Sequence, residues 1–363
     1  MEDITLIKKI ASQFKIKGNV TRVEKILIGH INTTFHIFTD SEEDYVLQRI
    51  NTNIFKDPHK LIENIYAVTS FLSEKIKRNG GNPKRETLTL IEAKTNNLLY
   101  SDKSGYYRMY IFIKNSTSYN SVERPILFYN AAVAFGRFQK LLCDFPAEKL
   151  NETIKDFHNT PKRFRDFSVS VEKNLARRAE TVKDEIMFFK DRKEFCAIIT
   201  DNISKGLIPL RVTHNDTKLN NIMIDNDTDE GICVIDLDTV MPGSVLYDFG
   251  DSIRFGASSA AEDEKDLSKV FMDLNLFEEY TKGFLLEARE SLNRHEIELL
   301  PIGAIMMTFE CGMRFLTDYL DGDKYFTVHY DGQNLDRART QIKLVSDMET
   351  KLNQMNEIIQ KYI

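Results

Sequence analysis

Asp216, Asn221 and Asp236 are the residues of this chain whose types and spacing could do chemistry. Asp216 follows the run Val212 to Asn215, Asn221 comes five residues later, and Asp236 ends the apolar run Ile232 to Ile235. Phosphoryl transfer from ATP needs a carboxylate beside the attacking hydroxyl and oxygen ligands that hold Mg²⁺ against the phosphates. The three residues therefore predict phosphoryl transfer, with Asp216 as the catalytic carboxylate and Asn221 and Asp236 as the Mg²⁺ ligands.

A β-hairpin is the element that must position these side chains. The apolar run Ile222 to Ile224, the polar turn Asp225 to Gly231 and the run Ile232 to Ile235 have the pattern of a hairpin, which would return Asp236 to the loop before it. Asp and Asn are also common turn residues, so any one of them alone would indicate only a turn. The three together, at this spacing, favour a functional site. His214 is expected to shape the loop through hydrogen bonds and not to act as an acid or base.

The same segments resemble the aminoglycoside phosphotransferase and choline kinase superfamily. Its pattern, His-x-Asp-x-x-x-x-Asn followed by a strand that ends in Ile-Asp, is matched from His214 to Asn221 and at Ile235 and Asp236. The resemblance to one branch, the N-acetylhexosamine 1-kinases, rests on the runs Thr213 to Lys218, Val234 to Gly243, Tyr247 to Gly256, Leu47 to Asn51 and Glu310 to Tyr325. It implies a kinase that uses ATP and Mg²⁺ to phosphorylate the anomeric C1 hydroxyl of GlcNAc or GalNAc.

Length and pattern predict two lobes. A chain of 363 residues exceeds the size at which one core usually stops growing. We expect an α+β, protein-kinase-like fold, with a small antiparallel-sheet lobe at 1–114 that binds the nucleotide and a larger, mainly helical lobe at 115–363 with the catalytic loop, the metal hairpin and the acceptor site. The patterns predict helices at 4–14, at about 58–78, from about 122 and twice within 167–205, and strands at 20–28, 33–39, 45–50, 87–92 and 106–113.

The turn between the first two predicted strands is a candidate phosphate-binding loop. Gly29 has no Cβ, so backbone at this position could approach a phosphate closely. His30, Asn32 and Thr33 belong to the same segment and are candidate ATP-binding residues with it. An ordinary hairpin turn would have the same sequence, and only its place in the first hairpin of the lobe favours phosphate binding.

Further candidates for ATP binding lie on the next elements of the same lobe. The resemblance implies a basic residue on the third strand that contacts the ATP phosphates and pairs with a helix acid. Arg49 and Glu63 are the candidates, where Arg replaces the more familiar Lys but can bind phosphate bidentately. Glu63 could equally be a surface acid. The segment from Ile111 to Ile113 resembles the connector between lobes, whose backbone would bond the adenine edge, although an ordinary core strand would look the same.

Arg314 and Asp238 are the candidates for binding the acceptor. Arg314 lies in the largely apolar run Glu310 to Tyr319, where a buried Arg is costly unless it is paired. The resemblance implies that Arg314 faces the sugar, and the alternative is a structural ion pair with Asp318 one turn away. Asp238 is expected to assist the metal or the sugar. The resemblance also implies that Asp248 ties back to the catalytic loop.

Composition narrows the classes of partner. A net charge of −6 supplies no broad basic field, which argues against nucleic acid. No run approaches the roughly 18 apolar residues of a membrane span, and the start Met1 to Ile4 has no signal-type apolar core. The four cysteines form no C-x-x-C pair and are expected to be buried free thiols in a reducing compartment. We therefore expect a cytoplasmic protein whose partners are ATP and a sugar; the oligomeric state stays open.

Two other functions share these residues. A kinase of another sugar, or of an aminoglycoside, would keep the same catalytic groups, because acceptor choice lies in the helical lobe. An inactive ATP-binding regulator is the alternative that is not an enzyme. It is disfavoured because the catalytic carboxylate and both metal ligands are present.

Overall fold

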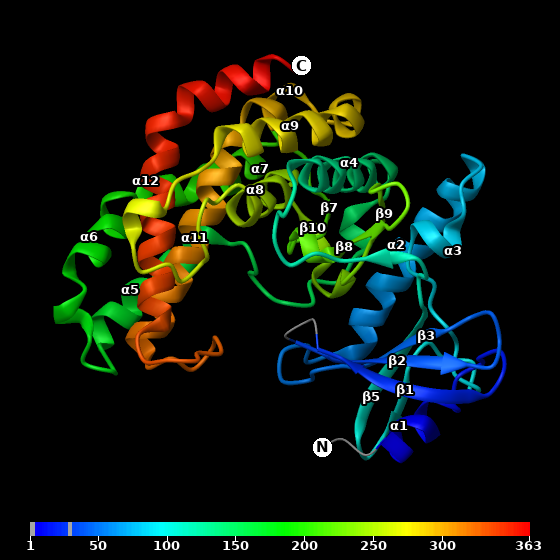
Figure 1. Ribbon diagram of the computed structural model, residues 1–363. Coiled ribbons are helices and arrows are strands. Elements are labelled where there is room, and N and C mark those ends of the chain that lie inside the picture. Colours follow the sequence, from blue (N-terminus) through cyan, green and yellow to red (C-terminus); the bar gives the residue numbers. More distant parts are fainter. Residues whose placement is uncertain (1–3, 28–30) are drawn as a thin grey trace. The chain divides into compact units, whose positions relative to one another are not determined.

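The computed structural model describes residues 4–27 and 31–363, and the chain forms two compact units (Figure 1). Unit 1 consists of residues 1–118, 144–155 and 222–241, and unit 2 consists of residues 119–143, 156–221 and 242–363. Unit 1 contains a small antiparallel sheet and unit 2 is mostly helical. This is the α+β, kinase-like fold that the sequence predicts.

The sheet of unit 1 has five strands in the order β1-β2-β3-β5-β4, and all neighbours are antiparallel. Antiparallel pairing follows from the short polar turns that join consecutive strands, such as the turn between β2 and β3 at residues 40–44. The elements are α1 (Ile4–Ala11), β1 (Val20–Ile26), β2 (Thr33–Thr39), β3 (Tyr45–Arg49), β4 (Tyr100–Asp102) and β5 (Gly105–Ile111).

The two faces of this sheet carry different side chains. Alternate side chains of a strand point to opposite faces, and Phe35, Leu47 and Met109 form one hydrophobic core with Ile10 and Phe14 at the N-terminal helix. The residues between them in the sequence face the other way. Gln48 and Arg108, which lie opposite each other on β3 and β5, are therefore on the face away from α1.

The predicted metal hairpin belongs to unit 1. Its strands β8 (Ile222–Asp225) and β9 (Gly231–Val234) pair with each other, and β8 also pairs with β6 (Ser116–Thr117). The sequence prediction placed this hairpin in the helical lobe and ended the first lobe at residue 114, so the units are divided differently from the predicted lobes. Strand β6 is the reason, because it pairs with a hairpin more than a hundred residues later in the chain. The remaining helices of unit 1 are α2 (Pro58–Arg78) and α3 (Pro83–Glu86).

Unit 2 is built on two close helix pairs, α4 (Pro125–Leu141) with α9 (Leu274–Ala288), and α11 (Leu300–Asp321) with α12 (Gln333–Gln360). A Cβ on Gly136 would lie 2.5 Å from the carbonyl oxygen of Phe284, and one on Gly283 would lie 2.5 Å from that of Tyr129. Glycine on both helices thus permits the close approach of α4 and α9. The other elements are α5 (Thr160–Lys173), α6 (Lys183–Asp191), α7 (Ile198–Ser204), β7 (Arg211–Thr213), β10 (Met241–Gly243), α8 (Val245–Gly256) and α10 (Arg294–Glu298).

Three local predictions were wrong. The segment predicted as a strand at 87–92 follows α3, which ends at Glu86, and makes an isolated bridge, Leu90 to Tyr110, in place of a strand. The helices predicted within 167–205 are three, and the first begins earlier, at Thr160, where the Asn159 side chain caps its N-terminus. The four cysteines were predicted to be buried, but only Cys196 and Cys233 are, whereas Cys143 is exposed and Cys311 is half-buried.

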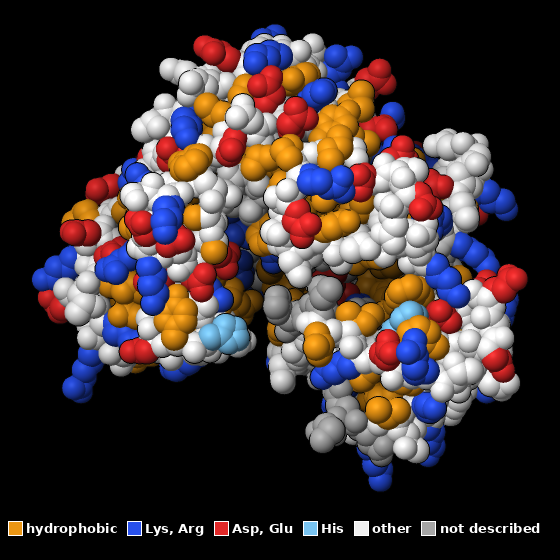
Figure 2. Space-filling view, viewed as in Figure 1, with side chains coloured by type: hydrophobic (Ala, Val, Ile, Leu, Met, Phe, Trp, Pro, Cys, Tyr) orange, Lys and Arg blue, Asp and Glu red, His pale blue; other side chains and the backbone are white. Residues whose placement is uncertain are grey.

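The described surface carries both signs of charge. Figure 2 shows Lys and Arg side chains interspersed with Asp and Glu over the face in view, without a broad field of one sign. None of the helices within residues 4–27 and 31–363 combines the length and the apolar character that crossing a membrane requires.

Candidate functional site

The loop after β7 brings two of the predicted catalytic residues into contact. The Asn221 side-chain Nδ2 donates to the backbone oxygen of Asp216 at 2.7 Å and to its carboxylate Oδ2 at 3.1 Å. Because Nδ2 is used in this way, the amide oxygen Oδ1 of Asn221 is the atom left to ligate a cation. The Lys218 ammonium lies 2.7 Å from Asp216 Oδ1. The Asp216 carboxylate is thus oriented by an amide on one oxygen and an ammonium on the other.

The charge of Asp216 is stabilised by its neighbours. Burial favours the neutral carboxyl, but Lys218, His214 and Arg254 outweigh this effect and lower the pKa of Asp216 below its usual value. Burial likewise opposes the ammonium of Lys218, while Asp216 and Asp251 raise its pKa. At neutral pH the pair is therefore a carboxylate and an ammonium.

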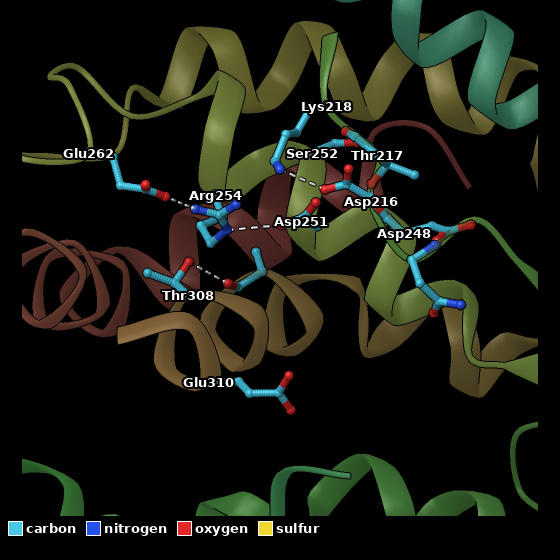
Figure 3. A network of polar contacts seen from close by, with 12 residues as sticks. Asp216, Thr217, Lys218, Asp248, Asp251, Ser252, Arg254, Glu262, Thr308 and Glu310 are labelled. Carbon is cyan, nitrogen blue, oxygen red and sulfur yellow. Dashed lines mark hydrogen bonds and ion pairs between the residues drawn. The ribbon is translucent and has the colours of Figure 1, made fainter. Parts of the chain in front are cut away.

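Next to this pair lies a chain of charged side chains, which Figure 3 shows from close by. Arg254 donates from Nε to Asp251 at 2.9 Å and from Nη1 to Glu262 at 2.8 Å. Two carboxylates thus satisfy one buried guanidinium. Asp251 in turn acts electrostatically on Lys218, so the network extends from α8 to the catalytic loop.

Asp248 holds the backbone of the catalytic loop, as the resemblance implies. Its carboxylate accepts hydrogen bonds from the backbone N–H of His214 at 2.9 Å and of Asn215 at 2.7 Å, and from the Gln139 side chain at 2.7 Å. Asn215 needs this support because it has a φ of 64°, which is uncommon for a residue other than glycine. The His214 ring packs edge-on against Phe135. It is fully buried, as expected for a residue that shapes the loop.

The other predicted metal ligand, Asp236, ends the hairpin of unit 1. Asp236 has a φ of 58° and precedes the short 3-10 turn Leu237–Thr239. Two residues on, Asp238 is 3% exposed and its Oδ1 lies 2.5 Å from Nη1 of Arg108. Arg108, itself 1% exposed, also donates from Nε and Nη2 to the Gln48 side-chain oxygen at 3.0 and 2.8 Å. Sequence reasoning missed Arg108, because it treated the strand only as a backbone contact for adenine.

Two asparagines hold the same turn from other elements. The Asn32 side chain donates to Asp238 Oδ2 at 2.6 Å and accepts from the backbone N–H of Asn51 at 3.0 Å. On α2, Asn64 donates to the Val240 backbone oxygen at 3.0 Å. Polar groups from β5, from α2 and from the loop before β2 therefore fix the segment that follows Asp236.

The remaining predicted ATP contacts lie elsewhere in unit 1. Arg49 is exposed. It is on the same face of β3 as Leu47, the face that packs toward α1, whereas Gln48 and Arg108 are on the opposite face. Glu63 is exposed and accepts from the Asn151 side chain at 3.2 Å. Within the described part of the chain no ion pair joins Arg49 to Glu63, so the predicted pair is not formed. Their contacts to ATP stay predictions.

The other predicted ATP contacts lie in the loop before β2, at the start of β2 and at the end of β5. Gly29 and His30 lie outside the described residues, and Thr33 begins β2 opposite Arg49. The backbone N–H of Ile111 donates to Thr89 at 3.0 Å, and the Ile113 backbone oxygen accepts from the Ser116 hydroxyl at 2.8 Å. The Ile111 N–H and the Ile113 oxygen are thus both hydrogen-bonded to other groups of unit 1.

Arg314 in unit 2 is surrounded by aromatic rings. Its guanidinium carbon lies 5.6, 5.8 and 5.5 Å from the ring centres of Phe157, Tyr325 and Phe326. The alternative partner Asp318 is occupied, since its carboxylate accepts from the backbone N–H groups of residues 324, 325 and 326. Among the residues that the structure describes, no carboxylate forms an ion pair with Arg314.

Glu310, one turn before Arg314 on α11, is bound to other partners. Glu310 is 1% exposed, lies 2.8 Å from His158 Nδ1 and accepts from the Thr160 hydroxyl at 2.6 Å. Burial favours its neutral form, but His158 and Arg314 hold the pKa of Glu310 below its usual value. His158 also contacts the Asn215 backbone oxygen at 3.4 Å. Neither His158 nor Thr160 was predicted, because only the fold brings them to α11.

A family model described as the phosphotransferase enzyme family matches residues 22–270, which include the catalytic loop and the hairpin. The chain belongs to this family. Its range also covers Arg108, Asp238 and Asp248 with their hydrogen-bond partners, whereas Glu310 and Arg314 lie beyond it.

Solved structures share the fold of this phosphotransferase. A microcompartment-associated aminopropanol kinase has 14% identity and a TM-score of 0.65, with 98% of this chain and 99% of that chain covered. Choline kinase from Cryptosporidium parvum has 14% identity and a TM-score of 0.61, with 99% of each chain covered. A spectinomycin phosphotransferase in complex with ADP and spectinomycin has 12% identity and a TM-score of 0.59, with 98% and 99% covered. At such identities the likeness concerns the fold alone.

Proposed function

We propose that this phosphotransferase is an ATP- and Mg²⁺-dependent kinase that phosphorylates the anomeric C1 hydroxyl of N-acetylhexosamines such as GlcNAc and GalNAc. Membership of the family supports phosphoryl transfer to a small molecule. The resemblance of the runs around Asp216, Asp236 and Arg314 to the N-acetylhexosamine 1-kinases supports the sugar. The observation that carries the choice of acceptor is the guanidinium of Arg314, which lies among three rings without an ion pair in the described part of the chain.

Asp216 has the properties that the proposed reaction needs. Its oriented carboxylate accepts the proton of the acceptor hydroxyl as that oxygen attacks the γ-phosphorus of ATP. The bond from this phosphorus to the bridging oxygen breaks, and ADP leaves with the electron pair. Lys218, 2.7 Å from Asp216, fixes the carboxylate and adds positive charge beside the reacting groups. Positioning and charge neutralisation can supply most of the rate enhancement in such a transfer.

The donor atoms that the chain offers suit Mg²⁺ bound to a nucleotide. Asn221 presents its amide oxygen once Nδ2 is bonded to Asp216, and Asp236 supplies a carboxylate held on a braced turn. Mg²⁺ usually takes one or two protein oxygen ligands and completes its shell with phosphates and water. In the described residues no group of three or more His, Cys, Asp or Glu could hold a metal, so the fit is to a metal that arrives with ATP. When bound, Mg²⁺ would neutralise charge that develops on the phosphates.

The charges of unit 2 support a neutral acceptor over a cationic one. The solved relatives named above include kinases of aminopropanol and choline, and the positive charge of Arg314 would repel such amines unless a carboxylate offset it. Near Arg314, the carboxylates of Glu310 and Asp318 are both occupied by partners of their own. The site instead offers guanidinium donors, which suit hydroxyl and amide oxygens.

A screen of acceptors tests this proposal. Purified enzyme with ATP and Mg²⁺ is offered GlcNAc, GalNAc, glucose, an aminoglycoside and an amino alcohol, and ADP formation is measured. The phosphate position of each product is then read by ³¹P NMR. We expect turnover of the N-acetylhexosamines with phosphate on C1. Turnover of only the amino alcohol or the aminoglycoside, or phosphate on another hydroxyl, would refute the proposal.

A further inference from the structure

Arg163, on the first turn of α5, is a second guanidinium beside Arg314. Its Nη2 donates to the Phe157 backbone oxygen at 3.1 Å, and the ring of the same Phe157 lies 5.6 Å from the guanidinium carbon of Arg314. One residue thus contacts both arginines. The Nε of Arg163 is buried and has no hydrogen-bond partner among the described residues, which is costly for a polar group unless a ligand completes it.

Neither guanidinium forms an ion pair with an acid among the described residues, although Glu310 acts on both electrostatically. Burial, and then the charge of Arg314, lower the pKa of Arg163 from its usual value. Glu310 is the nearby acid, and its two oxygens are taken by His158 and Thr160. Other arginines of unit 2 differ: Arg178 lies 2.5 Å from Asp323, and Arg254 has two acids. The two cations repel each other, as the effect of Arg314 on Arg163 indicates, and groups rich in oxygen would relieve this repulsion.

We propose that Arg163 and Arg314 together form a specificity element that binds the acyl oxygen and hydroxyl oxygens of the acceptor and excludes acceptors with a protonated amine. This inference rests on the proposed function and extends it from one residue to a pair. A guanidinium binds carbonyl and hydroxyl oxygens through its N–H donors, while a fixed pair of like charges disfavours an ammonium. The acceptor class is therefore N-acylated sugars, and free amino sugars are rejected.

Matched acceptors test the pair. GlcNAc and glucosamine differ in the acyl group and in the charge of the nitrogen. The ratio of their kcat/KM values therefore measures the selectivity that we assign to Arg163 and Arg314. We expect the wild-type enzyme to favour GlcNAc and Arg163→Gln to reduce this ratio by about tenfold or more, mainly through a higher KM for GlcNAc. Arg163→Lys keeps the positive charge but loses the planar guanidinium. Its ratio of kcat/KM values should therefore lie between those of the wild type and Arg163→Gln. Arg165→Gln, at an exposed position of the same helix, is the control and should keep the wild-type ratio.

The outcomes separate two failures. If the wild-type enzyme uses GlcNAc but the ratio is unchanged in folded Arg163→Gln, or changes equally in Arg165→Gln, the role of Arg163 is refuted and the proposed function stands. If Arg163→Gln does not fold, Arg163→Lys is the deciding variant. A wild-type ratio in Arg163→Lys would refute the proposed role of the Arg163 guanidinium. If the wild-type enzyme phosphorylates only amines, the proposed function and this inference both fail.

Discussion

Two arginines, one in each unit, show opposite ways of placing a guanidinium: Arg108 is buried and Arg314 is half-buried. Arg108 of unit 1 contacts the Asp238 carboxylate at 2.5 Å and the Gln48 amide oxygen at 2.8 and 3.0 Å. Arg314 of unit 2 is surrounded by three rings, and the acids near it are bound to other groups. Burying a guanidinium is costly, and among the described residues only Arg108 of the two forms an ion pair with a carboxylate.

The difference indicates different tasks. A cation that is satisfied within its own unit can brace the structure around it, and Arg108 braces the turn that follows Asp236. A cation that is left unsatisfied is available to a ligand, and we assign Arg314 to the acceptor. The comparison predicts that substitutions of Arg108 affect stability and the metal ligand together, whereas substitutions of Arg314 affect the acceptor alone.

Asp216→Asn removes the catalytic carboxylate without changing the structure, so it is the reference for the other variants. The amide keeps the shape of the side chain but cannot accept the hydroxyl proton, so kcat should fall by about 10²- to 10⁴-fold, with ATP binding nearly unchanged. Steady-state turnover and nucleotide titration of the purified variant measure both quantities. Near-normal turnover would rule out Asp216 as the catalytic carboxylate.

Asp236→Ala removes the metal ligand that the Arg108 network braces. Without this carboxylate Mg²⁺ is held more weakly, so the charge on the phosphates is less well compensated at the reacting centre. We therefore expect turnover to fall by about 10²- to 10³-fold with a raised Mg²⁺ requirement. Activity measured over a Mg²⁺ titration tests this. An unchanged Mg²⁺ dependence would contradict the assignment of Asp236 and leave Arg108 with a structural role only.

Arg108→Met breaks the buried pair and tests the bracing role. An uncompensated Asp238 should lower the free energy of unfolding by about 3–5 kcal/mol, while the double variant Arg108→Met with Asp238→Leu should regain most of it. If the pair also positions Asp236, the double variant keeps a raised Mg²⁺ requirement despite its recovered stability. Denaturant unfolding and Mg²⁺ titrations distinguish these effects.

The control for this experiment is Arg49→Met, because Arg49 is exposed on the neighbouring strand. Its stability should stay within about 0.5 kcal/mol of wild type. A KM for ATP that rises in Arg49→Met but not in the Arg108 variants would support the original sequence prediction for Arg49. A double variant of Arg108 and Asp238 with wild-type Mg²⁺ dependence would show that the pair serves stability alone.

The sequence predicted the features that depend on local pattern. The catalytic loop, the hairpin strands and the helix at 58–78 follow from the spacing of apolar and polar residues over short stretches. The contact between Asp216 and Asn221 also spans only five residues. The role of Asp248 was accessible only through the family resemblance, since its partners lie more than thirty residues away.

Features that depend on long-range pairing were missed. Arg108 and Asp238 are separated by 130 residues, and their pairing requires β3, β5 and the hairpin turn to meet. Arg49 was chosen over its neighbours because it is basic, but the face to which it belongs depends on which strand residues pack against α1. A period-two assignment of β3, with Tyr45 and Leu47 as its apolar face, could have separated Arg49 from Gln48.

Arg314→Ala tests the central claim most directly, because Arg314 lies outside the phosphoryl-transfer residues. Losing one charge-assisted hydrogen bond corresponds to about 1.5–3 kcal/mol, or roughly one to two decades in kcat/KM. We measure the KM values for GlcNAc and ATP together with the melting temperature. The account predicts a raised KM for GlcNAc, an unchanged KM for ATP and a melting temperature close to wild type. A destabilised variant with a normal KM for GlcNAc would contradict it and give Arg314 a structural role like that of Arg108.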